Sequence, residues 1–279
     1  MSITVNSISG GKTSAYIASN YKADYNVFAL VRTNDKSCLF PDAKLRQMVS
    51  DRLGIEFIGT LEDDMIIHTI FDLEQFIGQK IHWITGKTFD EVVTKSSIRY
   101  LPNVTQRFCT TEMKMKPFFD WWRANFNKPV EMRIGYRPNE LSRVERMLSK
   151  LSSNGFSTYK AIIGKSKTQN KWGEIEWRKP VFPLIDDNVF KDNIEEYWKD
   201  KPVRFAYMNN CIGCFHRNEM LLKLMSDKFP DKFDWFVRQE KDGATFKNGI
   251  TYAKIRKYPM LQELDFDDFN DCDSGYCSI

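Results

Sequence analysis

The apolar residues in the first third of the chain follow two alternating patterns. Short runs rich in β-branched and aromatic residues at positions 3–8, Tyr25–Val31 and Ile55–Gly59 predict buried strands. Between these runs the apolar residues recur at helical spacing, and Pro41 suits the first turn of the second such helix. Strands and helices that alternate in this way predict parallel strands joined by crossover helices.

The rest of the chain has a less regular pattern. Residues 64–122 favour helix, and Met132–Tyr136 is typical of another strand with an abrupt glycine end. The polar residues 151–179 predict a hairpin or a mobile loop, and a helix is expected around Asn188–Trp198. We therefore expect an α/β fold, a Rossmann-like parallel sheet flanked by helices, with a cysteine-bearing C-terminal extension.

Composition is that of a folded globular protein, with 42% hydrophobic and 28% charged residues among 279. The formal net charge of +4 permits an anionic substrate without demanding a nucleic acid. Neither a signal peptide nor an apolar run of about 20 residues is visible, so we expect a cytoplasmic protein without membrane insertion. Four lysines lie close together in the polar segment, at Lys160, Lys165, Lys167 and Lys171. We interpret them as a solvated surface, and contact with a nucleic-acid backbone is the alternative.

One short segment between the first strand and the first helix carries the strongest chemical signal. Two adjacent glycines let the backbone turn tightly and direct N–H groups at an anion, and the following helix adds its N-terminal dipole. A lysine supplies positive charge, and three hydroxyl side chains supply further donors. The adjacent glycines do not match the Walker A pattern. This candidate phosphate loop consists of Ser9, Gly10, Gly11, Lys12, Thr13 and Ser14.

The phosphate loop resembles the SGGK-x-S signature of the PP-loop ATP pyrophosphatases, the adenine nucleotide alpha-hydrolase-like superfamily. Three further strings are similar to motifs of its phosphoadenosine phosphosulfate reductase-like branch, and the resemblance covers about residues 1–215. These strings are Arg107-Phe108-Cys109-Thr110 with Lys114, the segment from Ile134 to Arg143, and Phe182-Pro183-Leu184-Ile185-Asp186. The second string has one extra residue before its serine, and the third lacks the tryptophan of the motif.

The resemblance implies a nucleotide-binding domain at residues 1–200, followed by a cysteine-containing metal or cluster region at residues 201–279. It implies that ATP with Mg²⁺, or a sulfonucleotide, binds beyond the carboxyl ends of the strands. Thr33 and Asn34 are expected near the adenosine. The residues expected in catalysis are Lys12, Cys109, Arg107 and Arg137. The residues expected to bind nucleotide beside the loop are Lys114, Gly135 and Arg143. Arginines suit this task because their guanidinium groups bind phosphate with two parallel hydrogen bonds and stabilise developing charge.

Six cysteines in a chain expected in the reducing cytoplasm favour metal binding or catalysis over disulfides. Cys211 and Cys214 form a C-x-x-C pair, whose two thiolates suit a tetrahedral metal ion or one side of a cluster. Resemblance to the sulfur-inserting ATPase of bacterial DNA phosphorothioation implies a [4Fe–4S] cluster held by this pair, Cys109 and one C-terminal cysteine, Cys277 or Cys272. The spacing equally permits a zinc site formed by the pair and both C-terminal cysteines, a redox dithiol, or no metal.

Three functions follow as alternatives. The first is an ATP-dependent enzyme that adenylates an acceptor, releases pyrophosphate, and then transfers sulfur from an unidentified donor to a nucleic acid or small molecule. The second is a phosphoadenosine phosphosulfate (sulfonucleotide) reductase. The intact phosphate loop argues against it, as does the absence of the E-C-G-[IL]-H motif by which such reductases resemble one another. The third is a zinc-stapled nucleotide- or DNA-binding module without turnover. A homo-oligomer is compatible with each function.

Overall fold

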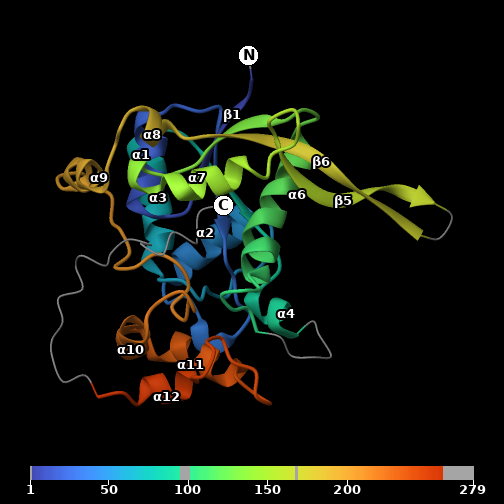
Figure 1. Cartoon of the computed structure of the whole chain (residues 1–279). Coiled ribbons are helices and arrows are strands. Elements are labelled where there is room, and N and C mark those ends of the chain that lie inside the picture. Colours follow the sequence, from blue (N-terminus) through green and yellow to red (C-terminus); the bar gives the residue numbers. More distant parts are fainter. Residues whose placement is uncertain (1, 95–100, 167–168, 260–279) are drawn as a thin grey trace.

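The computed structural model describes residues 2–94, 101–166 and 169–259. A sheet forms its centre (Figure 1). It has six strands in the order β3-β2-β1-β4-β6-β5. The neighbouring strands β3, β2, β1, β4 and β6 all run parallel. Only the edge strand β5 is antiparallel to its neighbour, β6. The strands are β1 Thr4–Ile8, β2 Tyr25–Leu30, β3 Ile81–Thr85, β4 Val130–Arg133, β5 Ser157–Ser166 and β6 Gln169–Val181. The expected α/β class, with a mostly parallel sheet flanked by helices, is confirmed.

Helices connect and cover these strands. Those before β4 are α1 Lys12–Asn20, α2 Ala43–Leu53, α3 Met65–Ile77, α4 Phe89–Thr94, α5 Phe108–Thr110 and α6 Lys116–Asn125. Those after it are α7 Leu141–Leu148, α8 Pro183–Asp186, α9 Lys191–Trp198, α10 Glu219–Lys228, α11 Pro230–Gln239 and α12 Tyr252–Arg256. A π-helical turn, Thr111–Met115, joins α5 to α6, and short 3-10 turns lie at Lys36–Cys38 and Pro138–Glu140.

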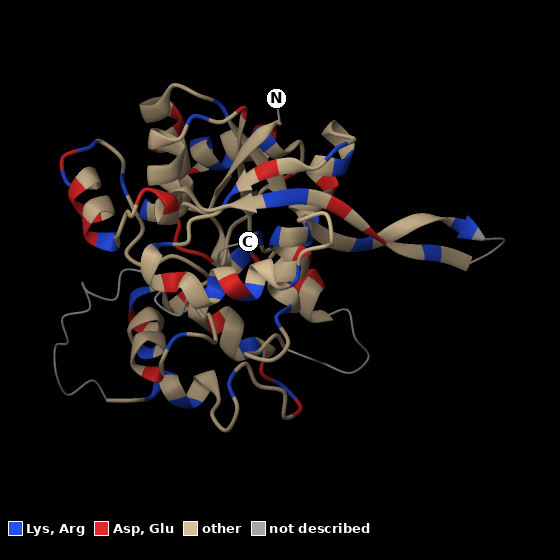
Figure 2. Ribbon diagram, turned by 45° about the horizontal axis from the view of Figure 1, so that its top comes forward, with Lys and Arg blue, Asp and Glu red and all other residues tan. Residues whose placement is uncertain are grey.

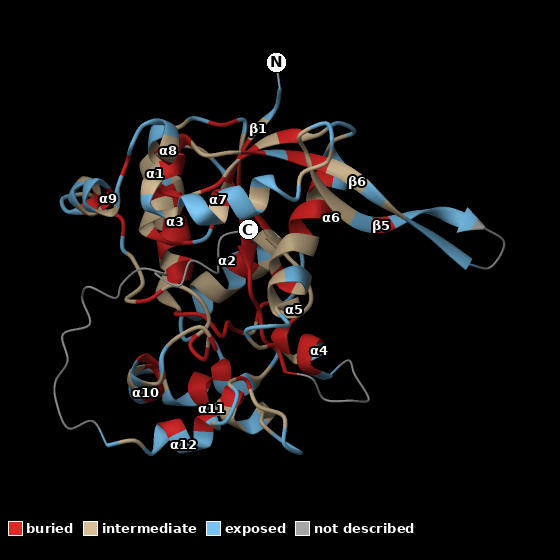
Figure 3. Ribbon diagram, viewed as in Figure 1, coloured by how far each residue is buried: buried red, intermediate tan, exposed pale blue. Residues whose placement is uncertain are grey.

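Both faces of the sheet are buried (Figure 3). Along β2, Phe28 and Leu30 pack in the cluster that contains α1 and α3, whereas Val27 and Ala29 pack in the cluster that contains α6. Strands buried on both faces are rich in apolar residues, which explains the continuous apolar run Val27–Val31.

One strand was predicted in the wrong place. Ile55–Gly59 is not a strand of the sheet, and the third strand is β3, in the span that the sequence predicted to be mainly helical. Residues 55–59 form only isolated bridges, from Gly59 to Thr33 and Leu39, because they cross the chain that leaves β2. β3 escaped prediction because it has only five residues, and so short an apolar pattern does not fix a period of two.

The helices α10 to α12 pack beyond the carboxyl ends of the strands (Figure 1). Trp235 and Phe236 of α11 belong to one hydrophobic cluster with Val31, which follows β2, and with Phe89 of α4. Cys272 and Cys277, and with them the fourth predicted metal ligand, lie outside the described residues. In the part of the chain that the structure describes, no helix combines the length and apolar character that crossing a membrane requires.

Candidate functional site

The strand order of the sheet reverses between β1 and β4. From β1 the chain passes through α1 to β2 on one side, and from β4 it passes through α7 to β5 and β6 on the other. In open α/β sheets, ligands bind beyond the carboxyl ends of the strands at such a switch point. The phosphate loop follows β1, and Gly135 follows β4, so two segments predicted to bind nucleotide lie at this point.

The phosphate loop has the conformation that its glycines permit. Gly10 has a φ of +80°, which an L side chain rarely adopts, and a Cβ there would lie 2.6 Å from Ile66 Cγ2. The Ser9 N–H donates to Ser14 Oγ at 3.0 Å, and Ser14 Oγ donates to the Gly11 carbonyl at 3.0 Å. Gly11 is the N-cap of α1, and no described side chain caps this helix. The N–H groups of the first helical turn are therefore well placed for an anion.

Helix α9 contacts the phosphate loop from the side. The Lys12 ammonium forms an ion pair with Glu195, and Trp198 Nε1 donates to the Lys12 carbonyl at 3.0 Å. Both charged side chains are about one-third exposed, at 30% and 35%. An anion at the start of α1 would therefore compete with the Glu195 carboxylate for the lysine.

The segment after β4 reaches the loop through a small residue. A Cβ on Gly135 would lie 3.1 Å from Thr13 Cγ2, so the two backbones approach closely there. The carboxylate of Glu140 accepts from Arg137 Nε at 3.2 Å and also pairs with Arg143. The Arg143 guanidinium carbon lies 4.2 Å from the centre of the Tyr136 ring. Glu140 thus holds together the two arginines predicted to bind phosphate.

The structure brings three of the predicted metal ligands to one cavity. Cys109 comes from α5, and Cys211 and Cys214 come from the loop before α10. The cavity has a volume of about 40 Å³, which is room for about three water molecules at ~10–15 Å³ each. Other residues that line it include Arg107, Lys114, Glu62, Asn210 and His216. Within residues 2–94, 101–166 and 169–259, however, no three or more His, Cys, Asp or Glu side chains are grouped closely enough to hold a metal ion.

Burial controls the titration of the groups in this cavity. It raises the pKa of the Cys109 thiol to about 11, with a further contribution from the nearby Cys214. Burial and then Glu62 raise the pKa of Cys211 well above its usual value. Burial and then Arg107 lower the pKa of His216 to about 4, so its imidazole is neutral at pH 7. Without a cation, Cys109 and Cys211 are therefore protonated at neutral pH and are weak nucleophiles.

A buried carboxylate, which the sequence interpretation missed, lies beside the cysteines. Glu62 is 2% exposed, and its Oε1 accepts from Lys114 Nζ at 3.1 Å. Its backbone forms a bridge with Cys211. Lys114 lines the cysteine cavity and pairs with Glu62, and its binding of nucleotide stays a prediction. Nothing in the local sequence distinguishes Glu62 from a surface glutamate, because its burial depends on contacts with residues more than fifty positions away.

Asn209 connects the phosphate loop with the cysteine cavity. A Cβ on Gly11 would lie 2.6 Å from Asn209 Nδ2, and Asn209 Oδ1 is buried without a hydrogen-bond partner among the described residues. The Asn209 carbonyl accepts from Arg217 at 2.7 Å, and Cys211 follows two residues later. The sequence interpretation missed this residue, although its position just before the C-x-x-C pair was visible.

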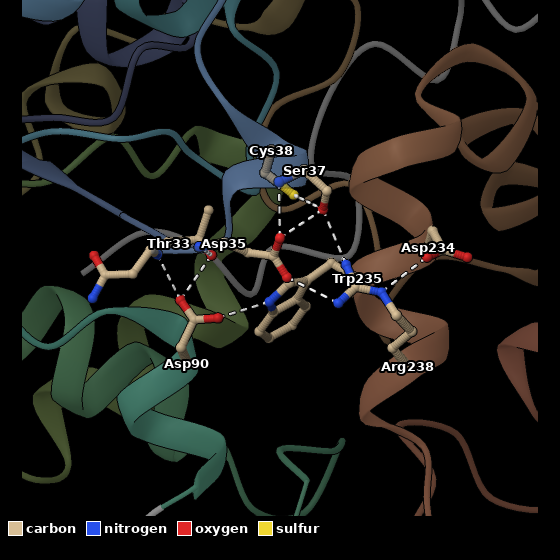
Figure 4. A network of polar contacts seen from close by, with 9 residues as sticks. Thr33, Asp35, Ser37, Cys38, Asp90, Asp234, Trp235 and Arg238 are labelled. Carbon is tan, nitrogen blue, oxygen red and sulfur yellow. Dashed lines mark hydrogen bonds and ion pairs between the residues drawn. The ribbon is translucent and has the colours of Figure 1, made fainter.

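The residues predicted near the adenosine take part in a structural contact (Figure 4). Asp90 of α4 accepts from the hydroxyl of the buried Thr33 at 2.7 Å and from the Asn34 N–H at 2.7 Å. Its other oxygen accepts from Trp235 Nε1 at 2.8 Å. The Asn34 side chain is exposed, and its predicted proximity to adenosine stays a prediction.

Comparisons of this chain with protein-family models, with curated proteins and with solved structures found no match. Arguments about its function therefore depend on the residues and geometry described above.

Proposed function

We propose that this protein is an ATP-dependent PP-loop enzyme that adenylates an acceptor with release of pyrophosphate, for transfer of sulfur to a nucleic acid or a small molecule. The observation that carries the proposal is the position of the glycine-rich turn. It joins β1 to the uncapped start of α1 at the switch point of the sheet, where Gly135 packs against Thr13. A loop of this kind suits a polyphosphate better than a single carboxylate, because backbone N–H groups, hydroxyls and a lysine are close together.

The proposed reaction begins with the terminal phosphates of ATP, as the Mg²⁺ complex, at Ser9–Ser14. An acceptor oxygen attacks the α-phosphorus, the bond to the bridging oxygen breaks, and pyrophosphate leaves from the loop. Lys12, Arg107 and Arg137 stabilise the charge that develops on the phosphates. A sulfur nucleophile then displaces AMP from the adenylated acceptor. The described residues suggest no particular carboxylate as a magnesium ligand, and ATP itself supplies phosphate oxygens for the ion.

The cysteine cavity supports the sulfur-transfer part of the proposal. We propose that Cys109, Cys211 and Cys214, with Cys277 or Cys272, hold a [4Fe–4S] cluster, because thiolates are the ligands that such clusters prefer. The cluster would supply sulfur or electrons next to the activated acceptor. Asn209 supports this arrangement, because it lies against Gly11 only two residues before Cys211.

Two alternatives use the same residues. A sulfonucleotide reductase would bind its nucleotide at the same loop, and release of sulfite rather than pyrophosphate would identify it. A zinc-stapled binding module would use Cys211, Cys214, Cys272 and Cys277 and would leave ATP unchanged after long incubation. Lys12 forms an ion pair with Glu195, and this pair favours neither alternative. The position of three cysteines at one cavity also favours neither.

The phosphate loop is tested by ATP affinity and pyrophosphate release. Replacement Lys12→Ala should weaken ATP binding at least about tenfold, because a hydrogen bond to a charged group contributes about 1.5–3 kcal/mol. Lys22→Ala, which removes an exposed lysine outside the loop, is the matched control and should bind like the wild type. Equal affinity of the two variants, or no ATP binding by the wild type, would reject the loop assignment.

The cysteine site is tested by the metal content of protein purified without oxygen. We expect iron and acid-labile sulfide, with visible absorbance, in the wild type. Cys109→Ser, Cys211→Ser and Cys214→Ser should each lose iron, whereas Cys38→Ser should keep it, because Cys38 does not line the cavity. Stoichiometric zinc without iron would support the binding module, and protein without either metal would contradict both metal hypotheses.

A further inference from the structure

Helix α9 packs against α1 beside the phosphate loop (Figure 1). Trp198 anchors this helix, because Trp198 Nε1 donates to the Lys12 carbonyl at 3.0 Å and the indole ring lies 5.6 Å from the ring of Phe76 in α3. The ring of Tyr197 meets that of Tyr16 in α1 edge-on, with 4.9 Å between the ring centres. Aromatic contacts and one backbone acceptor therefore hold α9 in place, and this packing needs no charged side chain.

The charge of α9 is opposite to what an anion-binding loop attracts. The helix carries the acidic residues Asp192, Glu195 and Glu196 and a single basic residue, Lys191 (Figure 2). Acidic side chains stabilise a helix near its N-terminus, whereas Glu195 lies in the last turn and gains nothing there from the helix dipole. Its carboxylate forms the ion pair with the Lys12 ammonium. Neither helix stability nor packing explains this carboxylate, but its contact with the phosphate loop does.

Glu195 occupies the only cationic side chain of the segment Ser9–Ser14. A phosphate group that reaches the Lys12 ammonium must first displace the carboxylate. Both side chains of the pair are partly exposed, so a displaced Glu195 turns to solvent without disturbing the apolar core. The N–H groups at the start of α1 have no side-chain cap, and they keep their direction whether the pair is closed or open. The phosphate loop thus has a competitor for phosphate within the same chain.

We propose that Glu195 promotes the release of pyrophosphate from the phosphate loop. This inference rests on the proposed function, in which ATP leaves its pyrophosphate at Ser9–Ser14. ATP is also held through its adenosine, so a lowered affinity of the loop leaves the nucleotide bound. Pyrophosphate lacks the adenosine, and it loses its cationic partner within the loop when Glu195 pairs again with Lys12. Because product release limits the turnover of many enzymes, a carboxylate that weakens binding here still favours catalysis.

The test is the binding of magnesium pyrophosphate, measured by calorimetric titration beside the binding of Mg–ATP. Glu195→Gln keeps the shape of the side chain and removes its charge. Pyrophosphate should then bind about threefold to fivefold more tightly, as the loss of a partly exposed competing ion pair implies. Dissociation of pyrophosphate, followed by stopped-flow displacement, should slow by about the same factor. In the Lys12→Ala background the same replacement should change neither quantity, because the carboxylate then has no lysine to compete for.

Glu196→Gln is the matched control, because Glu196 is 75% exposed and pairs with Lys199. It should bind and release pyrophosphate like the wild type, and both Gln variants should melt at the temperature of the wild type. If the wild type binds ATP and pyrophosphate but Glu195→Gln binds pyrophosphate no more tightly than Glu196→Gln, this inference alone is overturned. The same holds if the gain persists without Lys12. A wild type that binds neither ligand would overturn the proposed function as well.

Discussion

At the scale of single residues, Asn209 has contacts that its sequence neighbourhood does not explain. Its side-chain amide lies against Gly11, and its oxygen has no hydrogen-bond partner among the described residues. A buried polar atom without a partner costs about 1–3 kcal/mol. The N–H groups of the same amide are close enough to the phosphate loop to serve as a donor to an anion there.

This arrangement predicts an order among Asn209 variants. Asn209→Ala removes a donor and should weaken ATP binding a few-fold. Asn209→Asp keeps the shape but adds a negative charge beside the phosphates, so it should weaken binding more than tenfold, because like charges in contact cost several kcal/mol. Calorimetric titration with Mg–ATP measures both. Asn248→Asp adds the same charge at an exposed turn and should change nothing. If the Asp variant binds as well as the Ala variant, Asn209 does not face the phosphates.

At the scale of elements, the Asp90 carboxylate joins α11 to the chain that follows β2. Asp90 accepts from Trp235 Nε1 of α11 and from Thr33 and Asn34, which follow β2 (Figure 4). Arg238 of the same helix pairs with Asp35 at 2.9 Å. Because α11 and the loop before α10 share one hydrophobic cluster, this attachment also positions the loop that carries Cys211.

Removal of that carboxylate should therefore destabilise the protein. Asp90→Ala leaves the buried Trp235 N–H without its acceptor, and we expect a loss of about 2–4 kcal/mol in the free energy of unfolding. Urea unfolding followed by circular dichroism measures the change. Asp200→Ala removes an exposed carboxylate and serves as the reference. A loss no larger than in this reference would show that the Asp90 contacts add little to the docking of α11.

At the scale of the whole molecule, the sheet separates two regions with different chemistry. The phosphate loop and the cysteine cavity lie beyond the carboxyl ends of the strands and are joined by residues 209–211. The β5–β6 arm extends from the edge of the sheet that β5 forms, opposite the β3 edge.

The alternation of apolar runs and helical spacing was enough to predict the class of fold, because parallel strands buried on both faces must be apolar throughout. The adjacent glycines predicted the turn at Gly10 and Gly11, and the polar composition of residues 151–179 predicted a hairpin or a mobile loop, of which the structure shows the β5–β6 hairpin. It failed for the third strand, since a five-residue edge strand such as β3 carries too few apolar positions to fix its period. The grouping of Cys109 with Cys211 and Cys214 was expected by resemblance, and spacing alone would not have revealed it.

The sequence by itself determined the local conformations, because strand, helix and glycine turn depend on residues a few positions apart. Only the tertiary structure decided which side chains meet. Glu62 neutralises Lys114, Glu195 reaches Lys12, and Asn209 lies on Gly11 through contacts that span about fifty to two hundred positions. Contacts of such separation depend on strand order and on the docking of α9 and α11, which no local pattern of residues encodes.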